Sequence, residues 1–149
     1  MREASDSVRP DLTRMADECP ETDGVLAWQH AVMGNNRALE VMSAMVAMFA
    51  SGDPSEASHF VDESYHDHQG LGAGPLHGVN GFTSVVRTNF ASYRDLDVRI
   101  EDLFASVDRV AARITWEGHR VNGEHVVRRT IDILRIDNGR AVEHWGAAV

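Results

Sequence analysis

The sequence has 149 residues, a length that fits one domain with a single core. Hydrophobic residues make up 43% and charged residues 25%, a balance that argues against a disordered or fibrous chain. The net charge of -9 repels polyanions, so we expect no nucleic-acid partner.

The cysteine content and the hydropathy pattern indicate the expected cellular location. Cys19 is the single cysteine, so it has no partner for an internal disulfide and no companion for a zinc pattern, which favours a reducing, cytoplasmic location. The longest apolar stretch, Val41 to Ala50, is about half of the ~20 residues that a membrane span needs. The N-terminus also lacks a basic region followed by an apolar one, so we expect no membrane or export segment.

The first half of the chain predicts helices. Residues 1–34 are rich in Asp, Glu, Pro, Ser and Gly, which predicts an extension or a poorly ordered lead-in before a domain over residues 35–149. A helix is predicted from Asn35 to Ser51-Gly52, because apolar residues recur there at helical spacing. Asp53, as an N-cap before a proline, predicts a short helix through about Phe60. The segment LGAGPLHG then predicts a loop, and a third helix is expected over residues 80–93.

The second half predicts strands. Four β-like runs cover residues 97–104, 107–116, 125–136 and 141–147, and Asp137-Asn138-Gly139 predicts a hairpin turn between the last two. Helices first and consecutive strands afterwards indicate an α+β domain, with helices on one face of a curved, mostly antiparallel sheet. Such a curved sheet leaves a cone-shaped cavity.

Several short motifs occur in a consistent order from about Asn35 to the last residue. They are the helical opening before Gly52-Asp53, YHDH at 65–68, HG at 77–78, IEDL at 100–103, DRVA at 108–111, GH at 118–119, DILR at 132–135, Gly139, and EHW at 143–145. In these motifs the chain resembles the SnoaL-like polyketide cyclases of the NTF2-like superfamily. The resemblance implies a cone-shaped α+β barrel around a central pocket, usually a homodimer, which closes a ring of a hydrophobic polyketide by intramolecular aldol chemistry without a cofactor.

The chain departs from the family pattern after Trp145. The resemblance implies an acid/base aspartate shortly after the EHW-like segment, whereas the residues that follow here are Gly146-Ala147-Ala148-Val149. Three outcomes stay open: another acid or base acts, the reaction differs, or only binding remains. The Asp-Arg-Asp arrangement of the related epoxide hydrolases could use Arg113 and Asp132, but no matching second aspartate is found.

His68 is the first catalytic candidate, because it follows Tyr65 and His66 at the start of the Gly-rich loop and matches the family's histidine before its loop. The alternative is that His66 and His68 are surface loop residues. A zinc site from His66, Asp67 and His68 is less favoured, since no fourth ligand is evident and the chemistry needs no metal.

Asp132 is the second candidate, because it interrupts a nearly continuous apolar strand. Facing a cavity, it would have a raised pKa and act as base or acid. The alternative is an ion pair with Arg113 or Arg129 across the strands.

Strand parity gives the remaining candidates. Glu143 and Trp145 share one face of the last strand and His144 takes the other. We expect Glu143, as a third catalytic residue, and Trp145 inside the pocket, because the family's aspartate would have their parity, and His144 at a dimer interface. The other expected substrate contacts are Tyr65, His66, Trp116, Arg113 and His119, with Arg113 and His119 on the opposite face from Trp116.

The leading hypothesis is a cofactor-independent cyclase of natural-product biosynthesis that acts on an apolar polyketide-type substrate by acid/base chemistry. A hydroxylase, epoxide hydrolase or isomerase on a related polycyclic substrate is the alternative within enzymes. A ligand-binding or dimerisation module without catalysis is the alternative outside them.

Overall fold

The structure is a computed structural model that describes residues 21–69 and 76–149. The part of the predicted extension over residues 1–20 and the part of the predicted Gly-rich loop over residues 70–75 lie outside the described residues.

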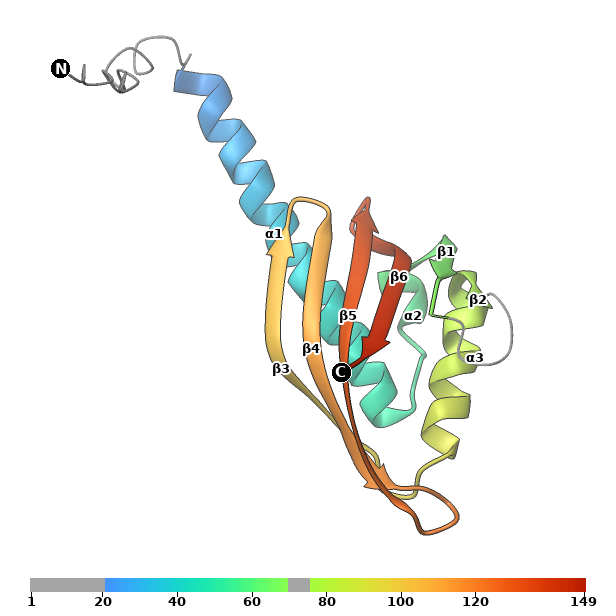
Figure 1. The fold of residues 1–149 in the computed structure, drawn as a ribbon. Coiled ribbons are helices and arrows are strands. Elements are labelled where there is room, and N and C mark those ends of the chain that lie inside the picture. Colours follow the sequence, from blue (N-terminus) through green and yellow to red (C-terminus); the bar gives the residue numbers. More distant parts are fainter. Residues whose placement is uncertain (1–20, 70–75) are drawn as a thin grey trace, which may run out of the picture.

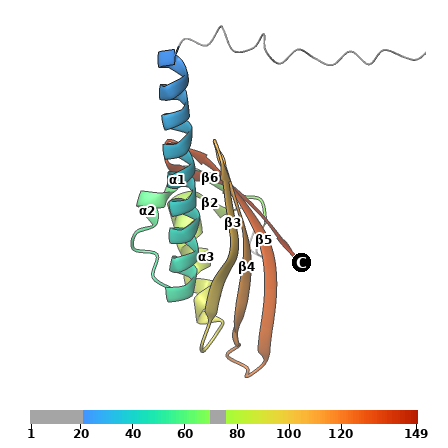
Figure 2. The same ribbon diagram turned by 90° about the vertical axis from the view of Figure 1, so that its left-hand side faces the viewer.

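Three helices precede the long strands, at different bounds from those expected. Helix α1 spans Glu21–Ser51, so residues 21–34 of the predicted extension are helical and continuous with the predicted helix. A helix that is nucleated by the apolar stripe from Leu39 onward propagates at little cost through a segment without proline. Its N-terminal part projects beyond the sheet (Figures 1 and 2).

The two shorter helices follow. Helix α2 covers only Ala57–Phe60, because a turn closed by the Ala57 N–H to the Pro54 carbonyl comes first. Asp53 accepts a bond from the Ser55 N–H at 3.0 Å within that turn. Helix α3 spans Gly78–Ala91, close to the predicted third helix.

Six strands form one curved, open sheet in the order β2-β1-β6-β5-β4-β3, with β2 and β3 at its edges. Every neighbouring pair is antiparallel except β1 and β6, which run parallel. The α+β fold class is confirmed, as an open sheet and not a closed barrel. The strands are β1 Val61–Asp67, β2 Leu76–His77, β3 Asp97–Ser106, β4 Arg109–His119, β5 His125–Asp137 and β6 Arg140–Ala148.

The hairpin between β5 and β6 has the predicted turn. Asn138 and Gly139 have φ of 47° and 74°, the positive values that a two-residue hairpin of this hand requires. The turn pairs Asp137 with Arg140, and a one-residue register shift between Arg135 and Ile136 then places Asp132 opposite Gly146 and Leu134 opposite His144.

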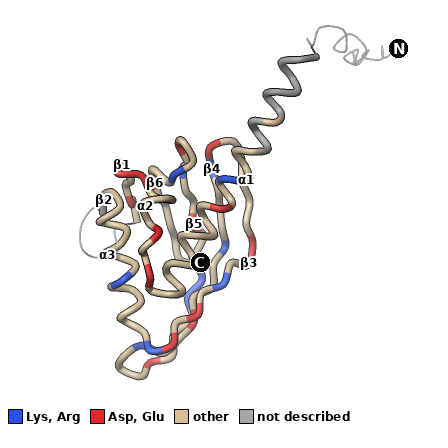
Figure 3. The backbone as a smooth tube through the Cα atoms, turned by 180° about the vertical axis from the view of Figure 1, so that it is seen from behind, with Lys and Arg blue, Asp and Glu red and all other residues tan. Residues whose placement is uncertain are grey.

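The helices cover one face of the sheet, and the core lies between the two layers (Figure 2). Val41, Val86, Ile114 and Leu134, from two helices and two strands, are all 2% exposed or less. Phe49 makes edge-to-face contacts with Phe82 and Trp116 at ring-centroid distances of 5.6 and 5.4 Å. Basic and acidic residues are interspersed along the described chain (Figure 3). Within residues 21–69 and 76–149, no helix is both long and apolar enough to cross a membrane.

The junction between β2 and α3 requires a glycine. Gly78 has φ of 65°, and a Cβ there would lie 2.9 Å from the Glu63 carbonyl oxygen of β1.

Gly78→Ala therefore combines backbone strain of about 1–2 kcal/mol with a clash that costs about 1–3 kcal/mol more. Gly123→Ala is the control, because Gly123 also has positive φ but a Cβ added there would meet nothing within 4 Å. Urea unfolding should show a larger loss in the free energy of unfolding for Gly78→Ala than for Gly123→Ala. Equal losses in the two variants would contradict the predicted clash with Glu63.

Candidate active site

A pocket lies between the helices and the inner face of the sheet, with an empty volume of about 650 Å³ that includes some open solvent. Most of its wall is apolar and comes from Met42, Met45, Val46, Phe49, Phe82, Val85, Ile114 and Leu134. Its polar lining comes from Tyr65, Asp67, Gln69, Asn89, Trp116, Arg128, Thr130, Asp132 and His144.

His144 of β6 lies between two aspartates in this pocket. Its Nδ1 lies 3.0 Å from Oδ1 of Asp67, and its Nε2 lies 2.9 Å from Oδ1 of Asp132. A neutral imidazole has one N–H and could donate to only one of them, so two such contacts to ionised carboxylates need the imidazolium form. The side chains are 13%, 7% and 9% exposed for His144, Asp67 and Asp132, so the ion pairs are largely shielded from water.

Asp132 also forms a hydrogen-bond chain with Thr130 and Trp116, two other residues that line the pocket. The Thr130 hydroxyl donates to Oδ2 of Asp132, and the Trp116 indole N–H donates to Oγ1 of Thr130 at 2.9 Å. Both oxygens of Asp132 therefore accept hydrogen bonds, the pattern that stabilises a carboxylate. On the other side, Asp67 accepts the Gln69 backbone N–H at 2.8 Å.

The pKa shifts agree with this geometry. Burial lowers the pKa of His144, but the hydrogen bonds and charges of Asp132 and Asp67 outweigh it and raise the pKa to about 9. Burial raises the pKa of Asp67, but the hydrogen bond and charge of His144, together with the Gln69 backbone hydrogen bond and the charge of His66, outweigh this and leave the pKa below its usual value. The pKa of Tyr65 is well above its usual value because of burial and the neighbouring charges of Asp67 and Asp132. At neutral pH the site therefore holds an imidazolium, ionised Asp67 and a protonated phenol.

Because Gly146 has no side chain, the Asp132 carboxylate fits into the space beside it. A Cβ at position 146 would lie 2.7 Å from Oδ1 of Asp132 and 2.7 Å from Oε1 of Gln69. Position 146 is thus the inward-facing position after the EHW segment, and Asp132 reaches into the same space from the opposite strand. In this packing a side chain at position 146 and the observed position of Asp132 exclude each other.

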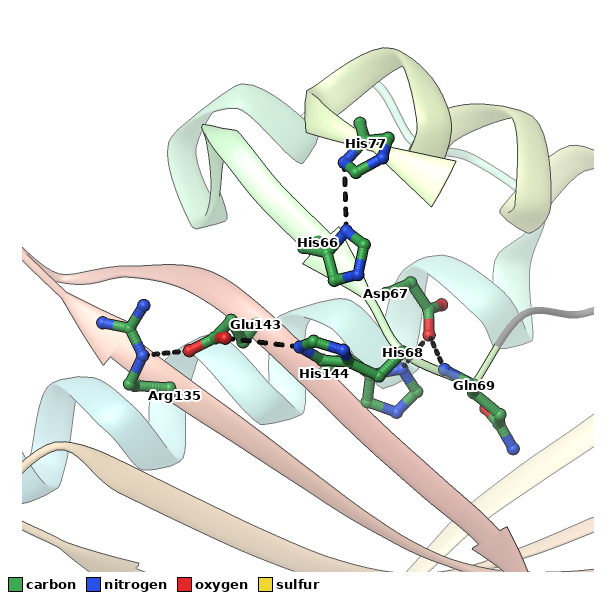
Figure 4. A network of polar contacts seen from close by, with 8 residues as sticks. All are labelled: His66, Asp67, His68, Gln69, His77, Arg135, Glu143 and His144. Carbon is green, nitrogen blue, oxygen red and sulfur yellow. Dashed lines mark hydrogen bonds and ion pairs between the residues drawn. The ribbon is translucent and has the colours of Figure 1, made fainter. Parts of the chain in front are cut away.

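Glu143 and Trp145 lie on the other side of the sheet from His144, so the expectation that they face the pocket is wrong. The parity argument placed the family's aspartate at the wrong residue, since Gly146 and His144 point inward. Glu143 accepts a hydrogen bond from Arg135 Nε and contacts His68, whose Nε2 lies 3.3 Å away (Figure 4). The His68 ring also stacks on Trp145 at 4.9 Å.

The YHDH segment divides between the two faces in the same way. Tyr65 and Asp67 line the pocket, as expected for Tyr65. His66 and His68 belong to the opposite set, where His66 lies 3.1 Å from His77 of β2 (Figure 4). The structure therefore does not bring His68 together with Asp132. Among the described residues, no group of three or more His, Cys, Asp or Glu is arranged to hold a metal ion.

The candidates on β4 also separate. Trp116 lines the pocket. Arg113 is exposed and pairs with Asp102 at 2.6 Å, and His119 is exposed and pairs with Asp95 at 2.9 Å. Arg113 thus lies outside the pocket that holds Asp132, so the two do not form the considered Asp-Arg-Asp arrangement.

Several pocket residues were missed from the sequence. Asp67 was considered only as a metal ligand and His144 only as a dimer contact, although Asp67 has the parity of Tyr65. Thr130 and Arg128 have the parity of Asp132 on β5, so alternation alone would have placed them beside it. No local signal pointed to Asn89 of α3 or to Gln69.

Comparison with known proteins agrees with this fold and pocket. The family model for SnoaL-like polyketide cyclases matches residues 39–148. The chain belongs to this family. No curated protein matches its sequence.

Solved structures show the same fold at low sequence identity. TsrD from Streptomyces laurentii is 23% identical, with 76% of this chain and 88% of that chain covered and a TM-score of 0.68. A SnoaL-like polyketide cyclase from Agrobacterium tumefaciens is 20% identical, with 73% and 88% covered and a TM-score of 0.62.

The ion pairs of His144 predict a pH-dependent stability. Its pKa is raised from 6.5 to about 9 on folding, so the stabilisation is fully present below pH 6.5 and is lost as pH rises through 9. The free energy of unfolding should fall by on the order of 3 kcal/mol over this pH range. Urea unfolding at about pH 6 and about pH 9.5 measures it, with His144→Gln expected to remove that pH dependence.

The control for this measurement is His119→Gln, which removes an exposed histidine paired with Asp95. It should keep the wild-type difference between the two pH values. A His144→Gln protein that loses as much stability on alkalinisation as the wild type would show that His144 is not the titrating group.

Proposed function

We propose that this protein is a cofactor-independent enzyme that closes a ring of an apolar polyketide-type substrate by aldol chemistry, with Asp132 as the base and His144 as the acid. The observation that carries the proposal is the hydrogen-bonded Asp132–His144–Asp67 group in a pocket whose wall is otherwise mainly apolar. Family membership supports the reaction class.

The proposed reaction needs one base and one acid. Asp132 takes a proton from a carbon between two carbonyl groups, and the electron pair of the C–H bond forms an enolate. The enolate carbon attacks a second carbonyl of the same molecule, so a C–C bond forms and that C=O π bond becomes an alkoxide. The alkoxide takes a proton from the His144 imidazolium, and proton transfer from Asp132 to His144 restores the starting state.

Tyr65 is suited to stabilise the negative oxygen. It is 2% exposed and lines the pocket, and its raised pKa keeps the phenol protonated as a hydrogen-bond donor. The charges of Asp67 and Asp132 help to raise this pKa. The proposed base, Asp132, therefore also helps to keep the Tyr65 phenol protonated.

The sequence supports acid/base chemistry over a covalent route. Its 149 residues include no lysine. An aldol step through a Schiff base on a lysine side chain is therefore not available to these residues.

Substitution of Asp132 tests the proposal. Asp132→Asn keeps the size of the side chain but removes the base, so turnover of a linear poly-β-ketone should fall about 100- to 10,000-fold. Product formation under substrate saturation measures it. His68→Ala and Glu143→Gln are the matched controls, because their side chains belong to the outer face.

The outcomes separate the alternatives. If the controls lose turnover and Asp132→Asn does not, the acid/base groups are His68 and Glu143 on the outer face. If the wild type binds such ketones without converting them, the module is a binding protein. If it hydrates, hydroxylates or isomerises a polycyclic ketone instead, the pocket serves a different reaction.

The homodimer that the resemblance implies stays a prediction, and the outer face of β5 supports it. Val127, Ile131 and Ile133 are 46%, 43% and 37% exposed on that face. If they form the subunit contact, Ile131→Glu should convert a dimer to a monomer in light scattering, because a buried unpaired carboxylate is costly. Val121→Glu, in the β4–β5 turn, should leave the mass unchanged. A mass unaffected by Ile131→Glu would place any dimer contact elsewhere.

A further inference from the structure

The pocket lining includes two further polar side chains that are not part of the Asp132–His144–Asp67 group. Arg128 of β5 and Asn89 of α3 both line the pocket. Nε of Arg128 and Nδ2 of Asn89 are buried and have no hydrogen-bond partner. Of the three such side-chain atoms among the described residues, these two belong to the pocket and the third belongs to Asn35 on α1.

Unpaired buried donors are costly in a folded protein, and an unpaired charged donor is costlier than a neutral one. Arg128 is partly compensated, because its guanidinium carbon lies 5.1 Å from the ring centroid of Trp116. None of the ion pairs among the described residues includes Arg128. Two donors without acceptors in one pocket are explained by an acceptor that arrives with the ligand.

We propose that Arg128 and Asn89 form a subsite for an oxygen anion of the substrate, either a carboxylate or an ionised enol. The inference rests on the proposed function and extends it, since it assigns a second recognition group to the substrate. Both side chains supply N–H donors, and the fixed charge of arginine favours an anion over a neutral carbonyl. The overall charge of -9 disfavours anions at long range, so this selectivity depends on the local cation.

The positions of Arg128 and Asp132 on β5 determine how far apart the anion subsite and the proposed base lie. Arg128, Thr130, Asp132 and Leu134 alternate onto the inner face, and all four line the pocket. Arg128 and Asp132 are four residues apart on this strand, so their Cα atoms are separated by roughly 13 Å. The substrate is therefore expected to carry an anionic oxygen at one end and the reacting carbonyls at the other, with the apolar wall between them.

Binding of matched small probes tests the subsite without any turnover. The first pair is 2-naphthoate and its methyl ester, and the second is 2-hydroxy-1,4-naphthoquinone, which is an ionised enol, and its methyl ether. The wild type should bind at least one anion about 10- to 100-fold more tightly than its neutral partner. The pair that shows the larger ratio identifies carboxylate or enolate as the preferred anion.

The variants are chosen to separate binding from folding. Arg128→Met should abolish the preference for the anion while affinity for the neutral ester or ether stays within about twofold, and Asn89→Leu should reduce the preference by a smaller factor. Arg129→Met is the matched control, because Arg129 is exposed on the other face of the same strand and its loss should leave the ratio unchanged. Arg128→Met should also leave the melting temperature equal or higher, because it removes an unpaired buried donor.

The proposal is overturned if the wild type shows no preference for either anion, or if Arg128→Met keeps the wild-type ratio. A ratio that falls equally in Arg129→Met would show that net charge and not the pocket attracts the anion, which also overturns it. These outcomes are independent of Asp132→Asn, which measures turnover, so the subsite and the proposed reaction fail separately.

Discussion

The buried imidazolium of His144 is the interaction on which the pocket depends. An isolated charge in such an apolar place would be neutralised or excluded, and either carboxylate alone would meet the same penalty. Because His144 donates to Asp67 on one side and to Asp132 on the other, three charges are buried together with their hydrogen bonds made. The arrangement joins β1, β6 and β5, three neighbouring strands of the sheet.

This group exists only because the strands meet in one register. The parallel pairing of β1 with β6 places Asp67 opposite His144, and the antiparallel pairing of β6 with β5 places Asp132 opposite Gly146. The glycine matters because it offers the space into which the Asp132 carboxylate extends. An aspartate contributed by β5 thus occupies the room that a side chain at position 146 of β6 would otherwise take.

Much of the fold was predictable because its signals are local. The hairpin turn at Asn138-Gly139 and the apolar run of β5 depend on neighbouring residues, and both were predicted. The extent of α1 was not predicted, because the Asp, Glu and Gly residues near its start favour an extension over a helix, although the segment continues a helix that is stabilised elsewhere. Asp132 was selected for its position in an apolar strand. Its partner His144 was assigned to the wrong face, because parity along one strand does not say which face is buried.

The two faces of β6 show why that assignment decides the chemistry. On the outer face His68 contacts Glu143, and on the inner face His144 contacts Asp132, so the residue types and the separations of about 3 Å are similar. The outer side chains are 35% and 27% exposed, whereas the inner ones are 13% and 9% exposed. Water screens the outer pair and weakens it, while the inner pair acts in a lower effective dielectric. In the proposed reaction, proton transfer to the substrate would therefore depend on the inner pair, because the imidazolium there would interact more strongly with an enolate formed in the pocket.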